Sequence, residues 1–161
     1  MAKYKNFFVN LVTNLTIVIA LSLWIAFPAL AVTQKLQFNT PAGYTVKTTF
    51  SYDETQKPKM IRERGNGKTE VLDSLKISFY NPSGELMANY NNVVEGIATG
   101  TYFEFNFDPA TQQILGKIDL GGESAGQMYL KGEAEGELSL IEVTQSGSEK
   151  VIDRVSIESS K

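Results

Sequence analysis

After Val32 the chain alternates bulky apolar and polar residues over several stretches. The clearest one runs from Tyr102 to Phe107, where three phenylalanines occupy every second position. Residues 44–52 and 75–79 alternate in the same way. A period of two places apolar side chains on one face of an extended strand, whereas a helix needs a period near 3.6. The pattern therefore predicts strands, with the phenylalanine face in the core.

Turn signals separate these stretches. Asn81–Gly84 reads NPSG, in which proline presets φ and glycine accepts a positive φ. We expect about eight strands, with residues 127–143 forming one bent strand or two short ones. Short sequential connections favour an antiparallel meander, which would form a small barrel or a barrel-like sandwich. The expected fold is a single all-β domain at residues 32–161, interrupted by a long basic loop at residues 54–69.

The first 31 residues differ from the rest. Lys3 and Lys5 give a positive start, and an apolar run follows at residues 15–27. The run is followed by Ala29-Leu30-Ala31, a small-x-small pattern. This order is typical of a secretory signal peptide and predicts a signal helix that is cleaved between Ala31 and Val32. The alternative is an uncleaved membrane anchor, which would require the apolar run to extend towards the N-terminus.

Cleavage predicts an exported protein without a stable membrane anchor. The destination would be the periplasm, the thylakoid lumen or the extracellular medium, because one type of leader serves all three. The only tryptophan, Trp24, lies in the leader. Tyrosine-dominated fluorescence of the purified protein would therefore support cleavage, and indole emission would count against it.

Composition excludes several chemistries. The 161 residues include no cysteine and no histidine. Disulfides, thiolate metal sites, cysteine nucleophiles and the usual general base near neutral pH are therefore excluded. The formal net charge of −3 becomes −5 without the two leader lysines. An acidic chain has no general electrostatic reason to bind nucleic acid, and we predict neither nucleic-acid binding nor a cofactor.

Two phrases of the sequence are similar to each other: FSYDETQ at residues 50–56 and FNFDPATQ at residues 105–112. Together with the longer stretch YFEFNFDPATQQILGKIDLGG at residues 102–122, they resemble secreted all-β domains that are common in cyanobacteria. In those domains F-x-Y/F-D precedes a threonine-rich turn at the ends of strands. The resemblance implies an exported bacterial β-domain of unassigned function, and it implies no site residues.

Basic residues are concentrated in the predicted long loop. Between residues 55 and 68 the only acidic residue is Glu63. The five basic residues are Lys57, Lys59, Arg62, Arg64 and Lys68. One interpretation is a loop that binds an anionic partner, such as a lipid headgroup of the cell envelope, an acidic polysaccharide or another protein. The other is a solvated loop whose charges keep the protein soluble. Both interpretations are compatible with the sequence.

Acidic residues dominate residues 95–142. Glu133, Glu135 and Glu137 would lie on one face of an extended strand, about 7 Å apart. Such a row favours either calcium, which prefers carboxylate oxygens, or full exposure to water. Because no known calcium-binding spacing is present, we expect no metal site, with these three glutamates as weak candidates.

Three functions are compatible with these features. The first is a non-catalytic exported β-domain that binds a protein, a glycan or a cell-envelope surface. The second is a lipocalin-like carrier of a small apolar ligand, which requires an interior cavity. A core filled by Phe79, Phe103, Phe105, Phe107, Leu130 and Leu138 would exclude such a carrier. The third is a carboxylate-based hydrolase. Because the acidic residues alternate or follow turns, we predict no catalytic residues and no enzymatic activity. The sequence predicts no particular oligomeric state.

Overall fold

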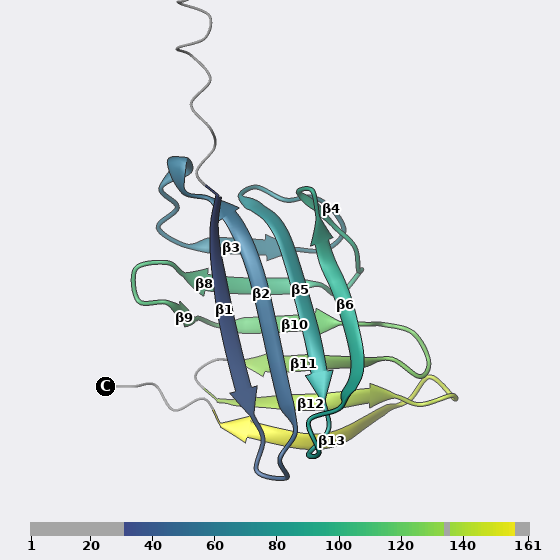
Figure 1. Ribbon diagram of the computed structural model, residues 1–161. Coiled ribbons are helices and arrows are strands. Elements are labelled where there is room, and N and C mark those ends of the chain that lie inside the picture. The colour runs from purple at the N-terminus through teal and green to yellow at the C-terminus, as the bar shows by residue number, and fades with distance from the viewer. Residues whose placement is uncertain (1–30, 134–135, 157–161) are drawn as a thin grey trace, which may run out of the picture.

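The computed structural model describes residues 31–133 and 136–156, and their strands form two antiparallel sheets (Figure 1). Across sheet A the order is β1 (Ala31–Asn39), β2 (Thr45–Asp53), β5 (Leu72–Tyr80), β6 (Leu86–Val94), β7 (Ile97–Ala98) and β4 (Gly67–Lys68). Across sheet B it is β13 (Glu149–Ser156), β12 (Glu137–Val143), β11 (Met128–Glu133), β10 (Lys117–Gly121), β8 (Glu104–Asp108) and β3 (Ile61–Arg64). In addition, β9 (Gln113–Ile114) pairs with β8, and the 3-10 helix η1 (Glu54–Gln56) follows β2.

The core lies between the two sheets, whose strands run in crossing directions (Figure 1). Phe50 of β2 packs edge-on against Phe105 and Phe107 of β8, with ring centroids 4.9 and 4.8 Å apart. These three side chains are fully buried. Alternate residues of each strand point into this layer and the residues between them face outward, as the pleat of a strand requires. The alternation in the sequence therefore creates one buried face and one outer face for each sheet.

The all-β fold and the buried phenylalanine face are confirmed. The sheets are not closed into a barrel, so the architecture is sandwich-like. The described residues contain thirteen strands rather than about eight. The additional strands are short pieces such as β4, β7 and β9, and residues 127–143 form two strands, β11 and β12. Strands β10 to β13 follow one another as a meander, whereas β3 and β4 belong to different sheets.

The six side chains that would leave no room for an apolar ligand are all in the core. Phe79, Phe103, Phe105, Phe107, Leu130 and Leu138 are each at most 1% exposed. They fill the space in which a carrier would hold its ligand. The structure therefore gives the lipocalin-like alternative no support.

The segment at residues 54–69 is only partly loop. It contains η1, β3 and β4, and the chain passes from sheet B to sheet A between Arg64 and Gly67. Within β3, Ile61 and Glu63 are buried while Arg62 and Arg64 are exposed. Strand β3 alternates in the same way as the other strands, but the many charged residues of this segment led to the prediction of a loop.

The predicted signal helix lies outside the described residues. The predicted cleavage bond, between Ala31 and Val32, joins the first two residues of β1. In the part of the chain that the structure describes, no helix is long and apolar enough to cross a membrane.

Candidate functional site

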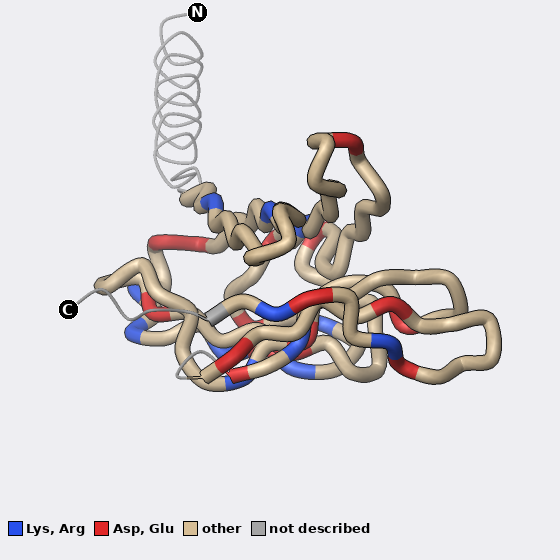
Figure 2. Tube along the Cα trace, turned by 90° about the horizontal axis from the view of Figure 1, so that it is seen from below, with Lys and Arg blue, Asp and Glu red and all other residues tan. Residues whose placement is uncertain are grey.

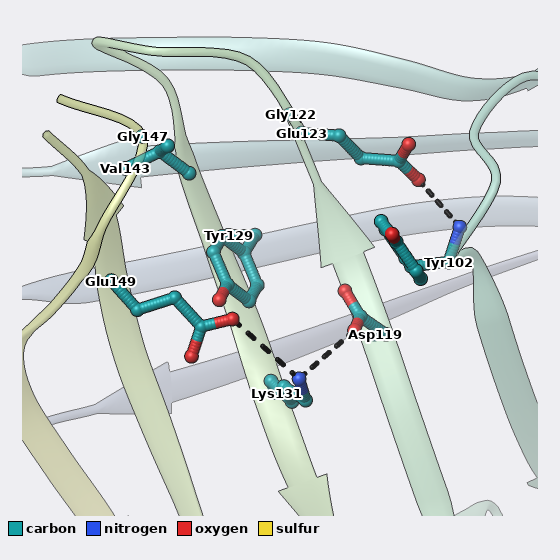
Figure 3. A pocket seen from close by; sticks show the side chains of 9 residues that line it. All are labelled: Tyr102, Asp119, Gly122, Glu123, Tyr129, Lys131, Val143, Gly147 and Glu149. Atoms are coloured by element: carbon teal, nitrogen blue, oxygen red, sulfur yellow. Dashed lines mark hydrogen bonds and ion pairs between the residues drawn. The ribbon is translucent and has the colours of Figure 1, made fainter. Parts of the chain in front are cut away.

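A polar pocket of about 330 Å³ lies on the outer face of sheet B. Asp119 of β10 and both Tyr129 and Lys131 of β11 line its floor (Figure 3). They face outward because their neighbours along each strand, including Leu120 and Leu130, face the core. Side chains from the surrounding loops and from β13 complete the wall.

The loop between β10 and β11 forms one side of the pocket and is fixed from sheet A. The Asn92 amide of β6 donates a hydrogen bond to the Gly121 carbonyl at 2.8 Å. The Tyr90 hydroxyl, also on β6, accepts one from the Met128 N–H at 3.0 Å. Both ends of this loop are thus attached to the other sheet, which gives the pocket wall a defined position.

Glu123, in that loop, orders the segment that precedes β8. Its carboxylate accepts hydrogen bonds from the N–H groups of Thr101 at 2.9 Å and Tyr102 at 2.7 Å. The Tyr102 side chain remains 70% exposed, the largest exposed fraction among the large hydrophobic residues described. In Figure 3 its ring lies between Glu123 and Asp119. An exposed aromatic ring with an anchored backbone is thus placed at the rim of the pocket.

Lys131 lies between two carboxylates. Its Nζ is 3.9 Å from Asp119 Oδ2 and 3.8 Å from Glu149 Oε1 (Figure 3). Asp119 and Lys131 face each other because β10 and β11 pair these two residues directly. The Tyr129 ring lies on the same side, with its centroid 6.0 Å from the ammonium group. Strand register therefore assembles this group of side chains.

Burial raises the pKa of Asp119 to about 6, an effect that the ammonium of Lys131 opposes and that the carboxylates of Glu123, Glu149 and Glu104 reinforce. The side chain of Asp119 is 16% exposed. Burial also raises the pKa of Tyr129, as does its hydrogen bond to Glu149. Tyr129 is therefore a neutral phenol at physiological pH, and Asp119 titrates within the range that cells and their surroundings reach.

This arrangement is suited to binding a polar ligand. Three carboxylates and one ammonium line the pocket, so its charge above pH 6 is negative. Carboxylates accept pairs of hydrogen bonds, and the exposed ring of Tyr102 provides flat apolar surface beside them, whereas Tyr129 is buried against Ile141 and Val143. Among the described residues, no group of three or more acidic side chains is arranged to hold a metal ion.

The five residues of the predicted basic loop are all exposed and are distributed over several elements: Lys57, Lys59, Arg62, Arg64 and Lys68. Lys57 ends η1 in a left-handed conformation with φ 45°. Arg62 and Arg64 lie on β3 at the edge of sheet B, whereas Lys68 lies on β4 in sheet A. None of the five lines the pocket.

The predicted row of glutamates is divided by a turn. Glu133 ends β11 and Glu137 begins β12, while Glu135 lies outside the described residues. Glu133 pairs with Lys117 at 3.7 Å, and Glu137 pairs with Arg154 at 3.3 Å. Each of these two carboxylates therefore forms a separate ion pair, and the two are not arranged around one metal ion.

Sequence reasoning identified the members of the pocket only as parts of larger sets. Asp119 and Glu123 belong to the acidic region, and Tyr102 and Tyr129 are two of several tyrosines. Their outward position follows from the alternation, but their proximity depends on the pairing of β10 with β11 and on the course of two loops. The sequence did contain a signal for the pairing of β10 with β11, because Asp119 and Lys131 are oppositely charged residues on consecutive strands.

No protein-family profile, no curated protein and no solved structure matches this chain. The function is therefore inferred from the geometry of the chain itself. The pocket on sheet B provides the most specific arrangement of side chains for such an inference.

Proposed function

We propose that the protein is a non-catalytic binding domain whose pocket on sheet B holds a sugar unit without acidic substituents, as part of a glycan. The main support for this proposal is the position of Tyr102. Its exposed ring lies at the rim of the carboxylate-lined pocket, and its backbone N–H is held by Glu123. A glycan that entered the pocket would pack against this ring.

The chemistry of the pocket matches a neutral or amine-bearing sugar. Neighbouring hydroxyl groups of a sugar can donate a pair of hydrogen bonds to one carboxylate, and the Lys131 ammonium can donate to a ring or hydroxyl oxygen. The C–H face of the sugar ring would pack on Tyr102, where flat apolar area is available. The negative charge of the pocket would repel the carboxylate of an acidic sugar.

Binding is favoured over hydrolysis by the position of Lys131. Glycoside hydrolysis requires two carboxylates with a reacting carbon or a water molecule between them. Here the Lys131 Nζ lies within 4 Å of both Asp119 and Glu149 and occupies the space between them. The raised pKa of Asp119 would suit a proton donor, but the carboxylate of Glu149, which would have to act with it, is in an ion pair with the same lysine.

We also propose that the protein is exported and cleaved after Ala31. The support is the order of charge, apolar run and small residues in the leader. Intact mass spectrometry of protein isolated from its host tests this, with a chain beginning at Val32 as the expected result. A chain that retains Trp24 would contradict the proposal.

Calorimetric titration with cellohexaose, the hexamer of N-acetylglucosamine and the hexamer of glucosamine tests the binding proposal. We expect at least one of the three to bind, and Tyr102→Ala to weaken that binding at least tenfold, or about 1.4 kcal/mol. Hexagalacturonate should not displace the bound sugar. Glu142→Gln, an exposed carboxylate on the same sheet that pairs with Lys150, is the matched control and should bind as the wild type does.

Two results would contradict the proposal. One is the absence of binding to all three oligosaccharides. The other is release of a reducing sugar by the wild type that is abolished in Asp119→Asn, since this would show hydrolysis.

A further inference from the structure

The outer face of sheet A carries three lysines around one shallow hollow of about 470 Å³. Lys35 of β1, Lys47 of β2 and Lys76 of β5 all line it and are all exposed. None of the residues that line this hollow is acidic. The basic residues that the sequence pattern brings to attention, those at residues 57–68, do not contribute to it.

Strand register explains how these lysines come together. One row across the sheet reads Lys35, Thr49, Lys76 and Asn91, and the next row reads Gln37, Lys47, Ser78 and Asn89. Adjacent strands lie about 4.8 Å apart and alternate residues about 7 Å apart along a strand, so the ammonium groups originate roughly 8–10 Å from one another. Hydroxyl and amide side chains occupy the positions between them.

The lysines of sheet A have no carboxylate partner within the described residues, in contrast to Lys117, Lys131, Lys150 and Arg154 of sheet B. Every ion pair among those residues joins strands of sheet B. Figure 2 shows both signs of charge along the strands of that layer. On sheet A, Lys47 instead lies over the Tyr80 ring, 4.9 Å from its centroid. The three lysines around this hollow are therefore free of ion pairs within the described part of the chain, although Asp73 and Glu95 line a neighbouring hollow together with Lys76.

We propose that this face, defined by Lys35, Lys47 and Lys76, binds an anionic polysaccharide. Three ammonium groups supply the attraction for the acidic groups of the polymer, and none of the three is held in an ion pair with a described carboxylate. Thr49, Asn89 and Asn91 supply hydrogen-bond donors and acceptors for sugar hydroxyls. The hollow is lined by residues of β1, β2 and β5, so an extended chain that lay in it would pass over several strands.

Other anionic partners fit this face less well. Docking on a lipid surface usually requires a cluster of roughly four to eight basic residues or an apolar face that enters the bilayer. Here there are three lysines, and the hollow between them is lined mainly by polar side chains. The acidic face of a second copy is also a poor partner, because carboxylates on sheet B already pair with Lys117, Lys131, Lys150 and Arg154.

The test uses polygalacturonate as the probe, with affinity measured by calorimetry at low and high salt. We expect binding at low salt that weakens as salt rises. The triple variant Lys35→Gln, Lys47→Gln, Lys76→Gln should lose at least tenfold in affinity. The matched control is Lys57→Gln, Lys59→Gln, Lys68→Gln, which removes the same charge from other exposed positions and should lose less than threefold. Both variants change only exposed side chains, and equal melting temperatures will confirm that they fold.

The Tyr102→Ala variant should bind polygalacturonate as the wild type does, so that failure of the pocket and failure of this face are distinguishable. Equal losses in the two triple variants would overturn the proposal, because net charge alone would then explain binding. So would the absence of binding at low salt. Binding to vesicles of phosphatidylglycerol but not to polygalacturonate, with loss in the sheet A variant, would replace the polysaccharide by a membrane. Salt-dependent self-association lost in that variant would replace it by a second copy.

Discussion

The carboxylate of Glu123 holds the backbone of Tyr102, with Glu123 Oε1 accepting a hydrogen bond from the Tyr102 N–H at 2.7 Å. The two residues lie on different loops, one after β10 and the other before β8. The loop that carries Glu123 is itself held by Tyr90 and Asn92 of the opposite sheet. The position of the exposed ring therefore depends on contacts that begin in the other layer of the sandwich.

Removing the Glu123 carboxylate should weaken sugar binding without unfolding the protein. Glu123→Ala leaves the N–H groups of Thr101 and Tyr102 without their acceptor, but water can replace it because these groups are exposed. We expect a three- to tenfold weaker affinity for the oligosaccharide and a free energy of unfolding lower by about 1 kcal/mol or less. Calorimetric titration and urea denaturation measure the two. A variant that bound as the wild type does would show that the anchor has no role in binding.

Sugar binding should also depend on the ionisation of Asp119. Because burial raises its pKa to about 6, the carboxylate loses its charge as the pH falls through that value. A protonated carboxyl accepts fewer hydrogen bonds, so affinity should fall between pH 7 and pH 5. The Asp119→Asn variant should show weaker binding with no such dependence. A wild-type profile without a change near pH 6 would contradict this role for Asp119.

The same carboxyl should appear in the pH dependence of stability. The folded protein binds the Asp119 proton more tightly than the unfolded chain does, so the cost of ionising this group is absent below its ordinary pKa of 3.8 and fully present above about 6. At pH 7 the variant Asp119→Asn should therefore be more stable than the wild type by up to about 3 kcal/mol, an advantage that disappears as the pH falls towards 4. Urea denaturation at several pH values measures the difference in the free energy of unfolding between the variant and the wild type. A difference that did not change with pH would contradict the buried position of Asp119.

Glu63 is expected to stabilise the fold rather than to act in a site. Its buried carboxylate accepts hydrogen bonds from the N–H groups of Glu70, Val71 and Leu72 at 2.9–3.2 Å. Glu63→Ala would leave these groups without an acceptor, at a cost of about 3 kcal/mol or more in the free energy of unfolding. Glu70→Ala is the control, because its exposed side chain can be removed while its N–H remains. Equal stability of the two variants would rule out this role.

Gly132 should tolerate no side chain. A Cβ on this residue of β11 would overlap the Glu137 carbonyl oxygen of β12, and its φ of 154° is one that other residues rarely adopt. Gly132→Ala should therefore lower the free energy of unfolding by about 2 kcal/mol or more. Gly136→Ala, whose Cβ would lie at an ordinary 3.7 Å from the Glu133 carbonyl oxygen, should change it little. Thermal denaturation compares them, and similar melting temperatures would contradict the close approach of the two strands.

The sequence predicts strands well where alternation is strong and poorly where charge or glycine intervenes. Phe103, Phe105 and Phe107 were expected in the core and are there. Residues 61–64 were expected in a loop because three of the four are charged, yet they form β3 with Glu63 turned inward. The reason is local. Three backbone N–H groups donate hydrogen bonds to the Glu63 carboxylate, which its polarity alone would place in water.

The two proposed surfaces could be predicted only in part. Alternation identifies Asp119, Lys131 and Lys76 as outward-facing, since their neighbours are apolar. Which of them lie side by side depends on register and strand order, and these depend on bulges such as the one between Ser51 and Tyr52. A shift of one residue would move every side chain to the other face, so pattern alone does not specify a site that spans three or four strands.

The most direct test of the pocket is an NMR titration of the isotope-labelled protein with an oligosaccharide that binds in the calorimetric assay. We expect the largest changes in amide chemical shift at Tyr102, Glu123 and Lys131, with little change at Lys35 and Lys76 on the opposite face. Changes confined to sheet A, or spread evenly over both sheets, would contradict a sugar site between β10, β11 and β13.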